Sequence, residues 1–198
     1  MLEIALLASG SRGNATLVRS ARASILLDAG LSTRQICRRL EVVGEDPRRL
    51  AAVLVSHEHG DHVSGLRVFC KRFATPVYAT AGTRGALAEV MDGGLPDADP
   101  IASGGRLQIE DLSIWPVGVS HDAAEPVGFV IEAASGERLG YATDLGVVTD
   151  EVSAALEGRS SGHCRRRELH GNGLRPADSI GGAQPVVRRA GAELRPLL

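Results

Sequence analysis

A short apolar run that leads directly into a cluster of ionisable side chains constrains the fold of this chain more than any other feature. Residues 51–55 read Ala-Ala-Val-Leu-Val, an uninterrupted stretch of strand length that is typical of a strand buried on both faces. Residues 56–62, which follow at once, read Ser-His-Glu-His-Gly-Asp-His. The sequence therefore predicts that the end of a buried strand carries a concentrated polar site.

The spacing of this polar cluster favours metal binding. His57 and His59 are separated by one residue, so in an extended segment their imidazoles project the same way and can bind one cation. Gly60 permits a turn, after which Asp61 and His62 lie where a helix begins. A single histidine at a strand end is usually a surface or core residue, but four donors of types that bind zinc and similar ions, within six positions, favour a metal site.

Turn clusters separate short apolar runs along the N-terminal part of the chain. Residues 2–7, 15–19 and 24–28 are predicted to be strands that form an opening β-meander. Ser32 is a candidate N-cap, and apolar residues recur at helical spacing from there to Gly44. After the polar cluster, the pattern predicts a helix over residues 63–72, a strand over 76–79 and a helix over 83–91.

The second part of the chain follows a loop rich in Gly, Pro and Asp at residues 93–100. Residues 106–119, 127–133 and 138–143 are expected to be antiparallel strands. Both parts therefore combine strands with helices, which fits an α/β fold with two sheets packed face to face and helices outside. A chain of 198 residues is long enough for one such domain.

The polar cluster resembles the His-x-His-x-Asp-His signature of the metallo-β-lactamase superfamily. Two later segments resemble further motifs of that superfamily in the same order: residues 119–122, Val-Ser-His-Asp, and residues 142–146, Ala-Thr-Asp-Leu-Gly. The likeness covers roughly residues 1–157 and implies a four-layer αββα sandwich that is incomplete at the C-terminus. More narrowly, the chain resembles the YycJ-like (WalJ-like) branch of the superfamily, whose members are identified as hydrolases with suggested nuclease activity. The segments that carry this resemblance are residues 8–15, 28–31, 76–80, 120–122 and 125–128.

The resemblance implies two divalent metal ions, zinc or manganese, with iron as a further option. Two such ions about 3.5–4 Å apart activate a shared hydroxide and clamp the oxygens of a phosphodiester during displacement. Asp61 is the expected catalytic residue, because it would orient the nucleophile. The implied metal ligands are His57, His59 and His121 for one ion, Asp61 and His62 for the second, and Asp144 as a bridge between them.

Other interpretations of single residues stay open beside the metal site. His121 alone could be a solvated turn histidine, and Asp144 a helix N-cap or turn carboxylate. Residues 28–30, Asp-Ala-Gly, are interpreted as a turn that ends a strand, and residues 9–14 as a turn that could lie near the metals.

The function that we expect is metal-dependent hydrolysis of DNA phosphodiesters. Two alternatives stay open. The protein could hydrolyse a small ester, thioester or lactone, or it could be a truncated, catalytically impaired metal-binding protein. The net charge of −2 gives no global attraction to a polyanion, so DNA would need a local basic patch. No signal peptide or membrane span is predicted, which indicates a cytoplasmic protein, and no protein partner is predicted.

Composition changes after Gly158. Residues 158–198 hold eight basic and three acidic residues, a net of +5, whereas residues 1–157 hold 14 basic and 21 acidic residues, a net of −7. Such an Arg-rich and Gly-rich tail fits a nucleic-acid-binding arm or an out-of-frame translation of GC-rich DNA, and we favour the second. We therefore expect a metallo-β-lactamase-like domain over residues 1–157 and an atypical, frameshifted or disordered tail. The superfamily's last ligand, a C-terminal histidine, would be missing, since His163 and His170 are poor substitutes.

Overall fold

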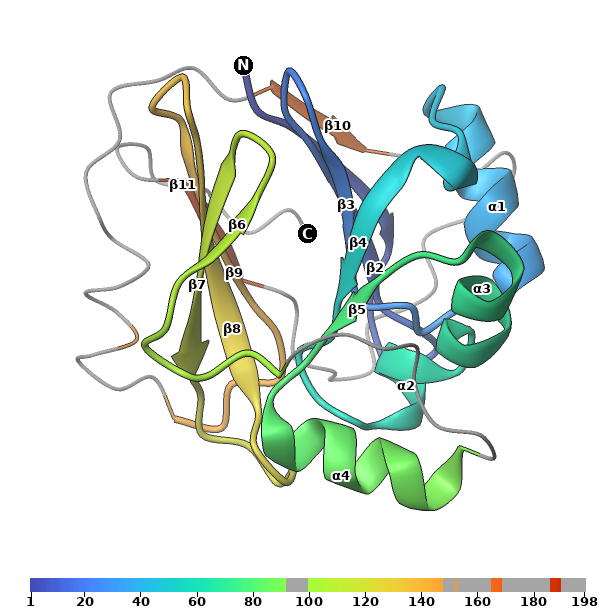
Figure 1. Cartoon of the computed structure of the whole chain (residues 1–198), viewed down its shortest axis with the longest axis vertical. Coiled ribbons are helices and arrows are strands. Elements are labelled where there is room, and N and C mark those ends of the chain that lie inside the picture. Colours follow the sequence, from blue (N-terminus) through green and yellow to red (C-terminus); the bar gives the residue numbers. More distant parts are fainter. Residues whose placement is uncertain (92–99, 148–151, 153–164, 169–185, 190–198) are drawn as a thin grey trace.

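Two β-sheets that pack face to face form the centre of the molecule (Figure 1). The computed structural model describes residues 1–91, 100–147, 152, 165–168 and 186–189. The first sheet contains, in spatial order, β10 (Arg165–Glu168), β1 (Glu3–Ala8), β2 (Ala15–Arg19), β3 (Ser24–Leu27), β4 (Leu50–Leu54) and β5 (Val77–Tyr78). The second contains β11 (Val186–Arg189), β9 (Arg138–Ala142), β8 (Val127–Ala133), β7 (Leu112–Gly118) and β6 (Leu107–Ile109).

The direction of each strand follows from its connection. β1, β2 and β3 form the antiparallel meander that the sequence predicts, because short turns join them. β3, β4 and β5 run parallel, since helical segments carry the chain back between them. The described strands of the second sheet are all antiparallel. After Gly158, β10 extends the first sheet beside β1, and β11 extends the second beside β9.

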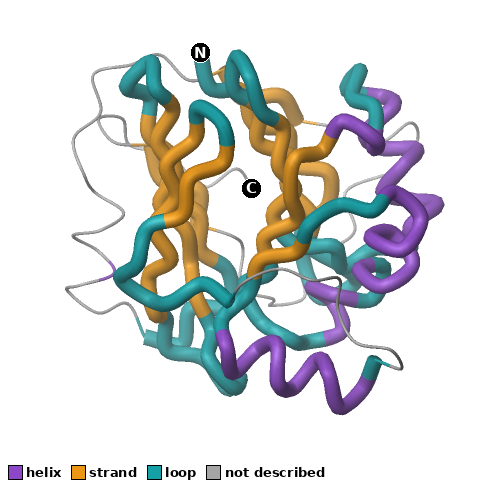
Figure 2. The backbone as a smooth tube through the Cα atoms, viewed as in Figure 1, coloured by secondary structure: helices purple, strands orange, loops and turns teal. Residues whose placement is uncertain are grey.

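Helices cover the outer face of the first sheet and one end of the sandwich (Figure 2). The N-cap Ser32 and Gln35 form a capping box that starts the first helix, as the sequence predicts for Ser32. The helical elements are α1 (Thr33–Val42), the 3-10 turn η1 (Pro47–Arg49), α2 (Gly60–Val63), α3 (Leu66–Phe73) and α4 (Ala81–Val90). α1 and α3 lie against the first sheet, and α4 lies at the end of the sheets where β4 and β5 terminate (Figure 1).

Two apolar layers hold these elements together. One lies between the helices and the first sheet and includes Ile36 and Phe69, and the other lies between the sheets and includes Phe129. In β4, Val53 faces the helices while Leu54 faces the second sheet, and neither side chain is exposed to solvent. The prediction of a strand buried on both faces is confirmed, and this strand delivers the polar cluster to the edge of the core.

The predicted α/β architecture is confirmed, and three of its four expected layers lie within the described residues. On the outer face of the second sheet, Val130 and Ala142 are buried together with Val152, a single described helical residue beyond β9. The rest of the predicted fourth layer lies outside the described residues. No helix in the described ranges is long and apolar enough to cross a membrane.

Two elements differ from the prediction. The expected single strand over residues 106–119 is a hairpin of β6 and β7, which turns at Glu110, whose φ is +51°. The expected helix over residues 63–72 is divided into α2 and α3 at Gly65. The chain comes so close to Leu31 there that a Cβ on Gly65 would lie 1.9 Å from the Leu31 carbonyl oxygen. A break at this point lets α2 turn its polar residues towards the end of the sheets.

Candidate metal centre

The polar cluster lies at the seam between the two sheets. His57 follows β4 of the first sheet, His59 is the N-cap residue of α2, and His62 lies within α2. The second sheet supplies His121 from the loop after β7 and Asp144 from the turn after β9. The chain thus brings together side chains that are up to 87 positions apart in sequence.

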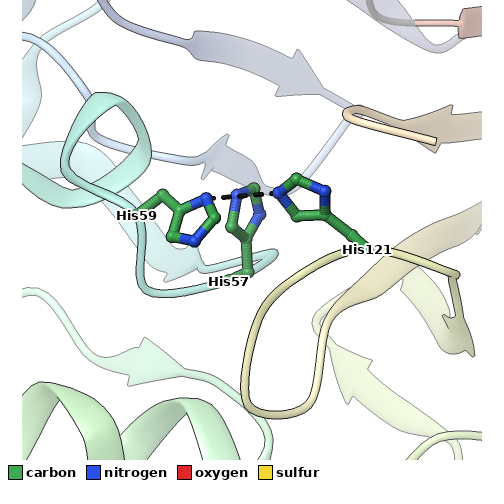
Figure 3. A group of neighbouring side chains, drawn as sticks. All are labelled: His57, His59 and His121. Atoms are coloured by element: carbon green, nitrogen blue, oxygen red, sulfur yellow. Dashed lines mark hydrogen bonds between the residues drawn. The ribbon is translucent and has the colours of Figure 1, made fainter. Parts of the chain in front are cut away.

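Three histidine rings form one donor group (Figure 3). The donor nitrogens of His57, His59 and His121 all lie within 4.8 Å of one another. His59 Nδ1 is 3.2 Å from His121 Nε2, and the His57 ring stands nearly perpendicular to both neighbouring rings. Three imidazole nitrogens that converge on one point are a common zinc ligand set.

A second donor group shares His57 with the first. One ligand atom each from His57, His62 and Asp144 lies within the same 4.8 Å limit. His62 Nε2 is 2.9 Å from Asp144 Oδ2, but the arrangement is not that of a hydrogen bond, so this buried oxygen has no hydrogen-bond partner. His57 Nε2 is also buried without a partner. Polar atoms are rarely buried unpaired, and a cation between them would satisfy both, so the residues present fit a metal ion.

Asp28 supports the second donor group from behind. Its carboxylate is completely buried and accepts hydrogen bonds from the Ser56 amide at 2.8 Å and the Ser56 hydroxyl at 3.0 Å. His62 Nδ1 at 2.9 Å and the Tyr141 hydroxyl at 2.8 Å also bond to Asp28 Oδ2. Because an ionised carboxylate only accepts, it holds the proton on Nδ1 and directs His62 Nε2 towards Asp144.

Charge in the pocket favours a cation beside His62. Burial alone would raise the pKa of Asp28, but the charge of His62 and the hydrogen bonds from His62, the Ser56 amide and Tyr141 outweigh it and lower that pKa. Burial would likewise lower the pKa of His62, yet Asp28, with Asp61 and Asp144, raises it. The pocket therefore attracts positive charge to the His62 ring, whether as a proton or as a metal ion.

His57 has the opposite electrostatic environment. Burial, followed by the charge of His62, lowers the pKa of His57 to about 3, although Asp28 opposes the shift. The ring is therefore neutral near pH 7, which is the form that binds metals.

Asp61 lies beside this site but outside both donor groups. Its Oδ2 is 3.6 Å from His62 Nε2 and accepts a hydrogen bond from Asn14 Nδ2 at 3.2 Å. The backbone N–H of Asn14 donates a second hydrogen bond, to the backbone carbonyl of Asp61, at 2.7 Å. Gly30 closes the other side, where a Cβ would lie 1.6 Å from that same carbonyl oxygen. Two loops, one after β1 and one after β3, therefore clamp the backbone of α2.

The loop that carries His121 is held by a separate set of contacts. Glu58 Oε1 accepts a 2.7 Å hydrogen bond from the Ala124 amide. Glu125 Oε2 accepts from the Gly82 amide in the first turn of α4 at 2.8 Å, and Thr80 donates to the Glu125 carbonyl at 2.7 Å. The second sheet is thereby tied to α4 and to the polar cluster of the first sheet.

The structure thus gathers His57, His59, His62, His121 and Asp144 into two groups and places Asp61 at their border. His163 and His170 lie outside the described residues. Sequence reasoning missed the supporting role of Asp28, which was interpreted as a turn, and that of Tyr141. For Asp28 the sequence holds a signal, because an acidic residue at the end of a predicted strand is a candidate hydrogen-bond partner for a metal-binding histidine. For Tyr141 there was none, because its contact crosses between sheets.

Comparison with known proteins identifies the family of this chain. The Beta-lactamase superfamily domain matches residues 23–160. The exodeoxyribonuclease YycJ of Bacillus anthracis is 34% identical over 165 residues, which are 81% of this chain and 61% of that protein. The exodeoxyribonuclease WalJ of Streptococcus pneumoniae (strain D39) is 32% identical over 155 residues, 77% of this chain and 57% of that protein. The chain spans about three fifths of the length of these relatives.

Solved structures share the same fold. A metallo-β-lactamase with a HARLDQ motif from Cronobacter sakazakii superimposes with a TM-score of 0.61 at 16% identity, over 80% of this chain and 75% of that chain. The resemblance to YycJ-like proteins and the metallo-β-lactamase fold, both expected from the sequence, are confirmed. Because the domain match covers more than half of its residues, the chain belongs to the β-lactamase superfamily.

Proposed function

We propose that this protein is a metal-dependent hydrolase that cleaves phosphodiester bonds in DNA. The observation that carries the proposal is the convergence of two donor groups on one buried histidine, His57, at the seam between the sheets. The similarity to two exodeoxyribonucleases favours DNA over other substrates. The proposal includes a cytoplasmic location, as expected from the sequence.

Each residue of the centre has a part in this proposal. His57, His59 and His121 would hold one ion, while His62, Asp61 and Asp144 would hold a second, with zinc or manganese as the metals. When bound, such ions supply an activated water and stabilise negative charge on the phosphate oxygens.

The surrounding residues orient these ligands. Asp28 fixes the ring of His62, and Glu58 holds the loop of His121 through Ala124. Asn14 donates a hydrogen bond to Asp61 Oδ2, and we assign to the Asp61 carboxylate the orientation of the attacking water, the role expected from the sequence.

A nuclease assay tests the proposal. Purified full-length protein, loaded with zinc or manganese, is expected to shorten end-labelled DNA and to lose this activity in EDTA. His59→Ala should reduce the rate at least about 100-fold, because a metal ligand contributes no less than its supporting residues. His170→Ala is the matched control and should keep the wild-type rate. Equal cleavage by wild type and His59→Ala, or turnover of a small ester, thioester or lactone without DNA cleavage, would refute the proposal.

A further inference from the structure

The helical layer over the first sheet is basic, although the rest of the domain is acidic. Residues 33–49 and 66–73 contain eight basic and three acidic residues, a net of +5. The remainder of residues 1–157 contains six basic and 18 acidic residues, a net of −12. The exposed cations form what we call the basic helical face: Arg34, Arg38, Arg48, Arg49, Arg67, Lys71 and Arg72.

Few acids oppose these cations within the layer. Of the three acids, Glu45 is buried and is paired with Arg19 from β2, Asp46 lies 3.6 Å from Arg48, and Glu41 is exposed on α1. Arg34, Arg38, Arg49 and Lys71 form no ion pair with any residue that the structure describes. Their charges are therefore available to an external anion.

The basic helical face begins next to the metal centre. The Thr33 hydroxyl, in the first turn of α1, donates to the carbonyl of Gly65, which immediately precedes α3. α2, with Asp61 and His62, ends two residues earlier. At the far ends, Glu41 of α1 and Arg72 of α3 line the same hollow. Both helices thus run away from the metal centre, over about 15 Å for the ten residues of α1.

We propose that the basic helical face binds the phosphate backbone of a nucleic-acid strand whose end lies at the metal centre. This inference rests on the proposed function. Six of the seven cations are arginines, whose planar guanidinium groups bind phosphate in a bidentate manner. A length of about 15 Å matches about four phosphates of one strand of a duplex, which follow one another at 3.4 Å along the helix axis.

A lipid surface fits this face less well than a nucleic acid does. Helices that lie in a membrane interface present Trp, Phe or Leu beside their cations. The large hydrophobic side chains exposed on the described part of this layer are two valines, Val42 and Val68. The face offers charge without the bulky apolar groups that would enter a bilayer.

A binding measurement separates this inference from catalysis. Fluorescence anisotropy with a labelled 20-base-pair DNA duplex, in EDTA, reports binding by the full chain without turnover. R38Q/K71Q removes two exposed charges from the face, and R22Q/R106Q removes two from outside it. R38Q/K71Q is expected to raise Kd at least about tenfold at low salt and to lower the slope of log K against log salt by about 1.5–2. R22Q/R106Q should change neither quantity.

Several results would overturn the basic helical face as the binding surface. These are wild-type affinity in R38Q/K71Q, an equal loss in R22Q/R106Q, or stronger binding to phosphatidylserine vesicles than to DNA. Circular dichroism and a thermal melt check that both variants are folded. If the wild type binds DNA through this face but never cleaves it, the proposed function fails while this inference stands. If the wild type cleaves DNA and R38Q/K71Q binds and cleaves it equally well, the proposed function stands while this inference fails.

Discussion

Asp28 shows how a single residue can control a site to which it contributes no donor. It lies in the left-handed region, with φ of +60°, directly after β3, and its side chain enters the space between the sheets. Through Oδ2 it joins His62 of α2 to Tyr141 of the second sheet. The geometry of the second donor group therefore depends on a contact between two strands that are distant in sequence.

Replacing this carboxylate should weaken metal binding more than it weakens the fold. In Asp28→Asn the amide cannot accept from all of its present donors, so the His62 ring loses its fixed orientation. We expect zinc affinity, measured by competition with a chromophoric chelator, to fall about 10–100-fold. Tyr141→Phe removes one of the hydrogen bonds and should show a smaller loss, with about 1 kcal/mol lower free energy of unfolding. Unchanged zinc affinity in Asp28→Asn would contradict this role.

Among the larger elements, α4 and the loop that carries His121 are joined by hydrogen bonds. The contacts of Glu125 with Gly82 and Thr80 join the start of the helix to the second sheet. Glu58 adds a further contact to the same loop. A substitution at the start of α4 can therefore displace His121 although it alters no candidate metal ligand.

Glu125→Ala tests this coupling. Loss of the carboxylate leaves the Gly82 amide unpaired at the start of α4 and removes a negative charge that favours a helix N-terminus. We expect a decrease of about 1 kcal/mol in the free energy of unfolding, from urea titration, together with weaker zinc binding. Glu132→Ala removes a carboxylate from β8 and serves as the control. If the two variants bind zinc equally well, the link between α4 and the His121 loop is wrong.

Most elements could be predicted from the sequence because they depend on local pattern. The apolar run before the polar cluster, the capping position Ser32 and the β-meander all have the predicted form. The hairpin turn at Glu110 was missed because a non-glycine residue adopts positive φ there. The break at Gly65 was missed because its cause is a close approach to Leu31, which is tertiary.

On the scale of the whole molecule, the candidate metal centre joins the two sheets. Three of its histidines, His57, His59 and His62, come from the end of β4 and from α2, and His121 and Asp144 come from the second sheet. Local sequence revealed the histidine cluster of the first sheet. The distances to the second sheet depend on how the two sheets pack, which no local pattern contains.

Bound metal should therefore stabilise the whole fold. An ion held by both sheets binds the native state alone, so the melting temperature should rise with the concentration of free metal. At 100 times Kd the expected gain is about 2.7 kcal/mol. Differential scanning fluorimetry with zinc and with EDTA measures it, and His59→Ala should show a much smaller shift. A melting temperature that does not respond to metal would exclude an ion that bridges the sheets.

The position of His57, whose ring belongs to both donor groups, has one more consequence. A coloured ion such as cobalt(II), bound there, would have ligands on both sides of the sandwich, and its absorption bands depend on how those ligands are arranged. Small shifts of one sheet against the other, caused for example by repacking around Phe129, would alter the spectrum while the protein remained folded. The absorption spectrum of the bound ion would then report on the alignment of the two sheets.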